Sequence, residues 1–158
     1  MDSILRSLDE AFVTIDRRSR DLLGRLKDGD LFRRPNGSPA SMRPFSCGEY
    51  ILRSSGAAEQ TFDGITTRLW DDPFEWTLPE KLSTKELIEQ YLDEVEETRQ
   101  KAFGSFTGDD NLKLAIPAPV EIRSLAEILI DTLSRASHLQ GSAFAIYQIL
   151  TNDRPPRF

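Results

Sequence analysis

The sequence predicts an all-α fold, a single up-down four-helix bundle over residues 1–158 with long connecting loops. Three observations lead to this prediction. Apolar residues recur every three or four positions in four segments, as in helices that bury one face. Three of these segments begin with a serine followed three residues later by a glutamate, the capping box that satisfies backbone N–H groups at a helix start. A chain of 158 residues can also build one core without disulfides or a structural metal.

The first helix is expected over residues 3–28, followed by a long loop over residues 30–44. One apolar stripe runs along this helix, with Ser19 filling a gap, and Gly29 marks its end. The loop contains three prolines, and loops of this length are often functional. We expect apolar side chains to pin it to the bundle, namely Phe32, Met42 and Phe45.

The second helix is expected over residues 46–70, with Ser46 and Glu49 as its capping box. Several residues of its apolar stripe are small, which lets a neighbouring helix approach closely. Its three glycines recur every eight residues and cost about 1 kcal/mol each relative to alanine. We therefore expect close packing to compensate for them at Gly48, Gly56 and Gly64.

A second loop over residues 71–82 leads to a third helix over residues 83–104, with Ser83 and Glu86 as its capping box. Three aromatic residues lie near this loop, and a core role is favoured for them over a ligand-stacking platform: Trp70, Phe74 and Trp76. The third helix is rich in carboxylates. We interpret them as a solvated face, because a di-metal site in such a bundle needs Glu-x-x-His pairs that this chain lacks.

The third connection, residues 105–123, is expected to contain a turn at Asp109-Asp110-Asn111 and a short extended piece before the fourth helix at 124–151. Ser124 and Glu127 form the last capping box. The fourth helix is apolar nearly all round, which favours a central position or a subunit interface. We predict a homodimer through this helix, with a thicker covering by loops as the alternative.

Composition excludes several classes of function. The net charge of −6 argues against nucleic-acid binding, which depends on basic patches. No apolar run reaches the ~20 residues of a membrane span, and the first residues do not resemble a signal peptide. One cysteine cannot form an internal disulfide. We expect a cytoplasmic protein with no nucleic-acid or membrane partner.

Two segments resemble the DinB/YfiT-like superfamily of four-helix bundles. The string FSCGEYILRSSGAAEQTFDGI is similar to the second helix of that family, and its matches are Phe45, Ser46, Glu49 and Leu52. The string TLSRASHLQGSAFAIYQIL is similar to the last helix of the family. The resemblance covers the whole chain in helix order and loop lengths, but its motifs are specific only in these two segments.

The family holds a divalent metal with three histidines, and this chain departs from that pattern. Arg53 and Ser134 stand at two of the three positions, and only His138 matches. Arginine stays protonated and has no lone pair for a metal. We therefore expect a degenerate metal site without a cofactor. The residues around it would form a pocket for a small anion or a carboxylate-bearing ligand, namely Arg53, Ser134, His138 and Glu49.

Simpler roles compete with this pocket. Arg53 can instead pair with Asp131 or Glu127 or point to water, and His138 can simply bond to a neighbouring residue.

Two other functional hypotheses remain open. The resemblance implies a metal-dependent hydrolase or thiol (S-)transferase if substitute ligands hold a metal such as Zn or Ni, the candidates being Glu49, Asp131 and Cys47. Cys47 lies at a helix start, which can lower a thiol pKa, although an inert buried thiol is favoured. The other hypothesis is a dimeric interaction protein that has lost its chemistry.

Overall fold

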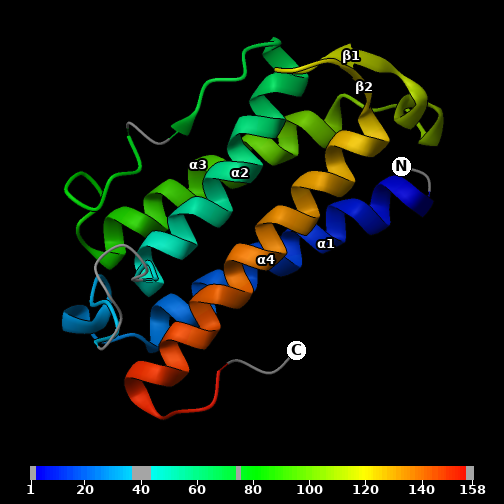
Figure 1. The fold of residues 1–158 in the computed structure, drawn as a ribbon. Coiled ribbons are helices and arrows are strands. Elements are labelled where there is room, and N and C mark those ends of the chain that lie inside the picture. Colours follow the sequence, from blue (N-terminus) through cyan, green and yellow to red (C-terminus); the bar gives the residue numbers. More distant parts are fainter. Residues whose placement is uncertain (1–2, 37–43, 74–75, 156–158) are drawn as a thin grey trace.

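The computed structural model describes residues 3–36, 44–73 and 76–155, so that Met42 and Phe74 lie outside the described residues. In the described part four α-helices pack together: α1 (Ser3–Arg25), α2 (Cys47–Thr67), α3 (Lys85–Gly104) and α4 (Leu125–Thr151) (Figure 1). Smaller elements are the 3-10 helices η1 (Asp28–Asp30) and η4 (Asp109–Lys113) and an antiparallel hairpin of β1 (Ala115–Pro117) and β2 (Ile122–Ser124). The predicted all-α four-helix bundle is confirmed.

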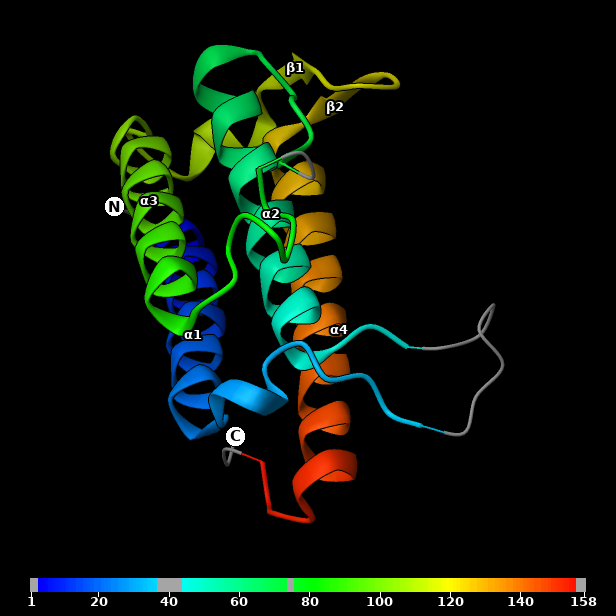
Figure 2. The same ribbon diagram turned by 90° about the vertical axis from the view of Figure 1, so that its left-hand side faces the viewer.

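The helices do not simply alternate in direction along the chain. Helices α1 and α4 run one way and α2 and α3 run the other (Figure 1). The contacts agree, because Asp109 after α3 accepts hydrogen bonds from the first turn of α1, at Ile4 N (3.2 Å) and Leu5 N (2.9 Å). Since α2 and α3 are consecutive and parallel, the chain between them must return along the bundle. It does so against α2 (Figure 2).

Two of the three predicted capping boxes are confirmed. Ser46 Oγ accepts from Glu49 N (3.2 Å), while the Glu49 carboxylate accepts from Ser46 N (2.8 Å). Ser124 and Glu127 repeat this arrangement. The Ser83–Glu86 prediction is wrong by one residue, because Thr84 is the N-cap of α3 and its hydroxyl accepts from Leu87 N at 3.3 Å. Thr84 also carries an acceptor hydroxyl, so the sequence offers two adjacent caps.

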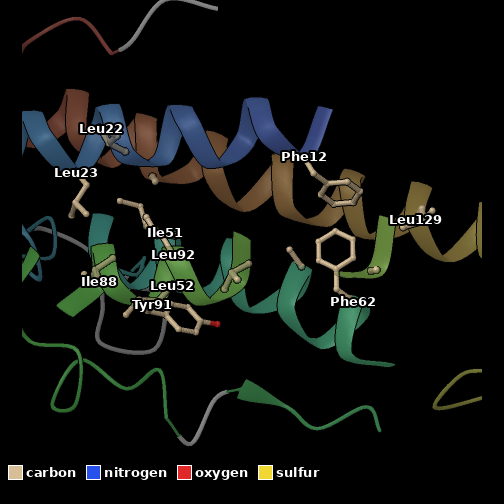
Figure 3. Close-up of a cluster of buried hydrophobic side chains, with 14 of the residues drawn as sticks. Phe12, Leu22, Leu23, Ile51, Leu52, Phe62, Ile88, Tyr91, Leu92 and Leu129 are labelled. Carbon is tan, nitrogen blue, oxygen red and sulfur yellow. The ribbon is translucent and has the colours of Figure 1, made fainter. Parts of the chain in front are cut away.

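Helix α2 lies at the centre of the packing, and more than half of its residues are buried. At one end of the core, the rings of Phe12 and Phe62 meet edge to face with centroids 5.0 Å apart (Figure 3). Phe103 from α3 completes this aromatic group. At the other end aliphatic side chains from α1, α2 and α3 fill the core: Leu22, Leu23, Ile51, Leu52, Ile88 and Leu92 (Figure 3).

The seam between α2 and α4 is narrow because small residues line both helices. Ser54 Oγ donates to Ala136 O at 2.8 Å, and the hydroxyls of Thr61 and Thr132 lie 2.7 Å apart. All four residues are buried. The stripe of small residues in the sequence therefore lets α4 approach closely, as predicted, and the buried hydroxyls are satisfied across the seam.

The glycines of α2 accommodate the connecting segments rather than a second helix. A Cβ added to Gly48 would lie 2.9 Å from Leu31 O, and one added to Gly56 would lie 2.9 Å from Pro73 Cγ. A Cβ on Gly64 would overlap the ring of Trp70. The expected compensation for three helix-weakening glycines is thus confirmed: each lets one piece of connecting chain lie directly on α2.

No helix in the described ranges is both long and apolar enough to cross a bilayer. The cytoplasmic location stays a prediction.

We predict that Gly64→Ala lowers the free energy of unfolding by about 1–3 kcal/mol, because the new methyl group displaces the Trp70 ring. Gly24→Ala in α1 is the matched control, since its added Cβ meets nothing within 4 Å. The control should raise stability by up to about 1 kcal/mol. Urea unfolding followed by circular dichroism measures both. Equal effects at the two positions would show that Trp70 does not rest on Gly64.

Candidate functional site

A cleft of about 200 Å³ opens at the seam of α2 and α4, beside the chain that connects α2 to α3. Three segments line it: Leu52, Arg53, Gly56, Ala57 and Gln60 from α2, Asp72, Pro73 and Thr77 from the connection, and Arg135, His138 and Leu139 from α4. Because Gly56 has no side chain, Pro73 can lie close to α2 at this point. The glycine therefore determines how closely the connection, which forms one side of the cleft, approaches α2.

The cleft carries more cationic than anionic side chains. Two guanidiniums, from Arg53 and Arg135, and the imidazole of His138 line it together with one carboxylate, from Asp72. Arg53 is half-buried, whereas Arg135 and His138 are exposed. Guanidinium groups from two different helices therefore line one cleft.

Packing fixes the position of Arg53. Its guanidinium carbon lies 3.9 Å from the centre of the Phe45 ring, a cation–π arrangement, and that of Arg34 lies 5.5 Å from the same ring. The two acids considered as partners of Arg53 have other roles, since Asp131 pairs with Arg123 and Glu127 caps α4. Phe45 thus pins the first loop to the bundle, as predicted, and orients Arg53 at the cleft.

The other two predicted site residues lie outside this cleft. Ser134 is exposed on α4 and is absent from the lining. Glu49 caps α2 and pairs with Arg34, and it lines a neighbouring cleft instead. Burial alone raises the pKa of Glu49, but hydrogen bonds from Arg34 and Ser46 outweigh it and hold the pKa below its usual value. Of the four predicted residues, Arg53 and His138 line this cleft, and Arg53 and Glu49 line the neighbouring one.

Arg135 was missed by sequence reasoning, although it is the next residue after Ser134. The helix spacing alone indicates it, because Asp131, Arg135 and His138 follow the i, i+4, i+7 spacing of one helix face. Within the described residues Arg135 makes no ion pair. It is the one guanidinium that lines both the cleft and the neighbouring hollow beside Trp70.

The side chains of the cleft do not fit a divalent metal. In the described part of the chain, no three histidine, cysteine or acidic side chains come together in a group that could hold one. The cleft itself supplies one imidazole and one carboxylate beside two permanent cations, which oppose a metal ion. Metal-assisted chemistry therefore has no support from the side chains of this cleft.

Cys47 is a buried thiol. It is fully inaccessible, its Sγ–H donates to Ala143 O at 3.4 Å, and burial, assisted by Asp30, raises its pKa to about 12. The positive end of the helix does not overcome this desolvation. The buried position expected for this thiol is therefore confirmed, and its pKa is raised rather than lowered.

A further polar cluster, not found from the sequence, ties the connection to α2 and α3. The Glu59 carboxylate accepts from the indole N–H of Trp76 at 3.4 Å and from the hydroxyl of Tyr91. Burial raises the pKa of Glu59. Because Trp76 lies between the cleft residues Pro73 and Thr77, this cluster holds the connection against α2 beside the cleft.

The carboxylates of α3 form a solvated face, as predicted. Glu86, Glu89, Glu94 and Glu97 are exposed. Asp93 reaches Arg20 of α1 at 2.8 Å, so that part of this face links two helices.

Family models, curated proteins and solved structures were compared with the chain, and none of the three comparisons gives a match.

We predict that Cys47 resists alkylation by iodoacetamide at pH 8 in the folded protein and reacts fully in 6 M guanidinium chloride, because the thiolate is the reactive form. Intact-mass spectrometry measures the added group. Modification of the native protein within minutes would contradict the buried position of the thiol.

Proposed function

We propose that this chain is a DinB-like protein that binds a small anionic ligand, a carboxylate or a phosphate, in the α2–α4 cleft without a metal. The resemblance of the second and fourth helices to that family supports this proposal. So does the replacement of one family histidine position by Arg53, which exchanges a metal ligand for a cation at the cleft. The described fold is of the expected class.

The observation that carries the proposal is the convergence of Arg53, Arg135 and His138 on one cleft from two helices. Guanidinium groups bind carboxylate and phosphate through two parallel hydrogen bonds, and these charge-assisted bonds are stronger than neutral ones. The volume of about 200 Å³ suits a small ligand or one part of a larger one.

The alternative is a hydrolase or thiol transferase that holds a metal through substitute ligands. The side chains of the cleft argue against it, and two of the candidate ligands have structural roles, since Glu49 pairs with Arg34 and Cys47 is buried. Binding of the ligand, rather than covalent chemistry by the chain, is the role these residues support.

We predict that Arg135→Gln weakens the binding of inorganic phosphate or succinate at least tenfold, because the substitution removes a guanidinium fork and keeps most of the side-chain length. Isothermal titration calorimetry at low salt measures the dissociation constants. Arg17→Gln is the matched control, since Arg17 is exposed on α1 and does not line the cleft. A high dissociation constant for the wild type, or an equal increase of the dissociation constant in both variants, would reject a specific anion site.

We also propose that a second copy of the chain covers the outer face of α4. Ile130 and Ile149 are 56% and 65% exposed there, and an added Cβ at Gly141 meets nothing within 4 Å. No Asp, Glu, Lys or Arg occurs in residues 136–151, although 29% of the chain is charged. The exposed side of α4 over residues 136–151 therefore carries no charged side chain, and such a surface favours association.

For this dimer we predict that light scattering at 100 µM gives the wild-type protein twice the mass of one chain. Ala145→Glu introduces a charge on the exposed face, and this variant should have the mass of one chain. Val13→Glu on α1, where Val13 is 40% exposed, is the control and should remain dimeric. A monomeric wild type would refute the proposal.

A further inference from the structure

The cleft continues along the α2–α4 seam into a second hollow of about 280 Å³. Ala57, Gln60 and Arg135 line both spaces, so that the two form one groove. Arg135 stands where they meet. A groove of this size is in the range of sites that bury a drug-sized ligand.

The second hollow differs from the first because an aromatic ring lies on one side of it. Trp70 rests on Gly64, where an added Cβ would overlap the ring, and its indole N–H donates to Pro117 O at 3.1 Å. Trp70 therefore lines the hollow with a ring whose position is fixed on two sides. A ring held in this way loses little freedom when a flat group stacks on it.

The rest of this hollow is apolar or neutral overall. Ala118, Pro119 and Ile128 contribute apolar surface. The charges of Arg123 and Asp131 compensate each other, because the two side chains form an ion pair. The cationic excess thus lies at the Arg135 end, and the flat apolar surface lies at the Trp70 end.

A third hollow adjoins the cleft at Leu52, Arg53 and Thr77, and α4 contributes no residue to its lining. The third hollow, of about 260 Å³, contains Phe45, but the guanidinium of Arg53 already covers that ring at 3.9 Å. Glu49 and Glu80 add negative charge there. An anion at Arg135 is therefore better extended towards Trp70 than towards Phe45.

We propose that the groove binds an aromatic anion, a phosphate or carboxylate joined to a planar ring, with the anionic group at Arg53, Arg135 and His138 and the ring stacked on Trp70. This inference rests on the proposed anion site and names its ligand class. Stacking on Trp70 adds affinity that a bare anion cannot gain.

The test compares phenyl phosphate with inorganic phosphate, and phenylacetate with acetate, by calorimetry. We expect each aromatic anion to bind at least fivefold tighter than its bare counterpart. Trp70→Leu should abolish this advantage and leave the binding of the bare anion unchanged, whereas Trp70→Phe should retain part of it. Arg135→Gln should weaken all four probes. Thermal melts check that each variant is folded.

A fluorescence arm locates the ring directly. The chain has two tryptophans, and Trp76 contacts Glu59 and does not line the groove. Trp76→Phe therefore leaves Trp70 as the single tryptophan, whose emission can be excited selectively. Phenyl phosphate should change its emission and inorganic phosphate should not.

Each outcome has a distinct meaning. Equal affinities for aromatic and bare anions, or an advantage that survives Trp70→Leu, would overturn the aromatic inference and leave the anion site standing. If none of the probes binds the wild type, both the anion site and this inference fail. Preference for one aromatic probe over the other would identify phosphate or carboxylate as the anionic group.

Discussion

The parallel course of α2 and α3 is the constraint from which the other features follow. Because these consecutive helices run the same way, the chain between them must travel back along the bundle, and it lies on α2 (Figure 2). A helix with large side chains on every face could not accept it. Gly56 and Gly64 remove the Cβ where Pro73 and Trp70 lie. Their cost in helix propensity is offset by the burial that this close approach allows.

The groove is a consequence of the same arrangement. Helix α4 lies against α2 through small residues and buried hydroxyls, so the two helices are close together along the seam. The connection supplies Trp70, Pro73 and Thr77 on one side, and α4 supplies Arg135 and His138 on the other. Side chains from α2, the connection and α4 therefore meet at the groove. The packing of these three segments, rather than the local sequence, determines which side chains line it.

The helices could be predicted because their signals are local: apolar spacing and the two capping boxes each involve neighbouring residues. The site was only partly predictable. Arg53 and His138 were found through a family resemblance, but Ser134 was chosen where Arg135 lines the cleft, since one residue rotates a helix position by about 100°. Trp70 packs against the core, as expected. Its place beside the groove depends on the path of the connection, which no periodicity encodes.

The central claim is that Arg53, Arg135 and His138 form one anion site. Side-chain NMR of ¹⁵N-labelled protein during a phosphate titration tests it most directly, because each arginine Nε–H and histidine ring signal reports its own surroundings. We expect saturable shifts with a common dissociation constant at these three residues and none at Arg17. Shifts that are absent, or spread evenly over all exposed arginines without saturation, would contradict it.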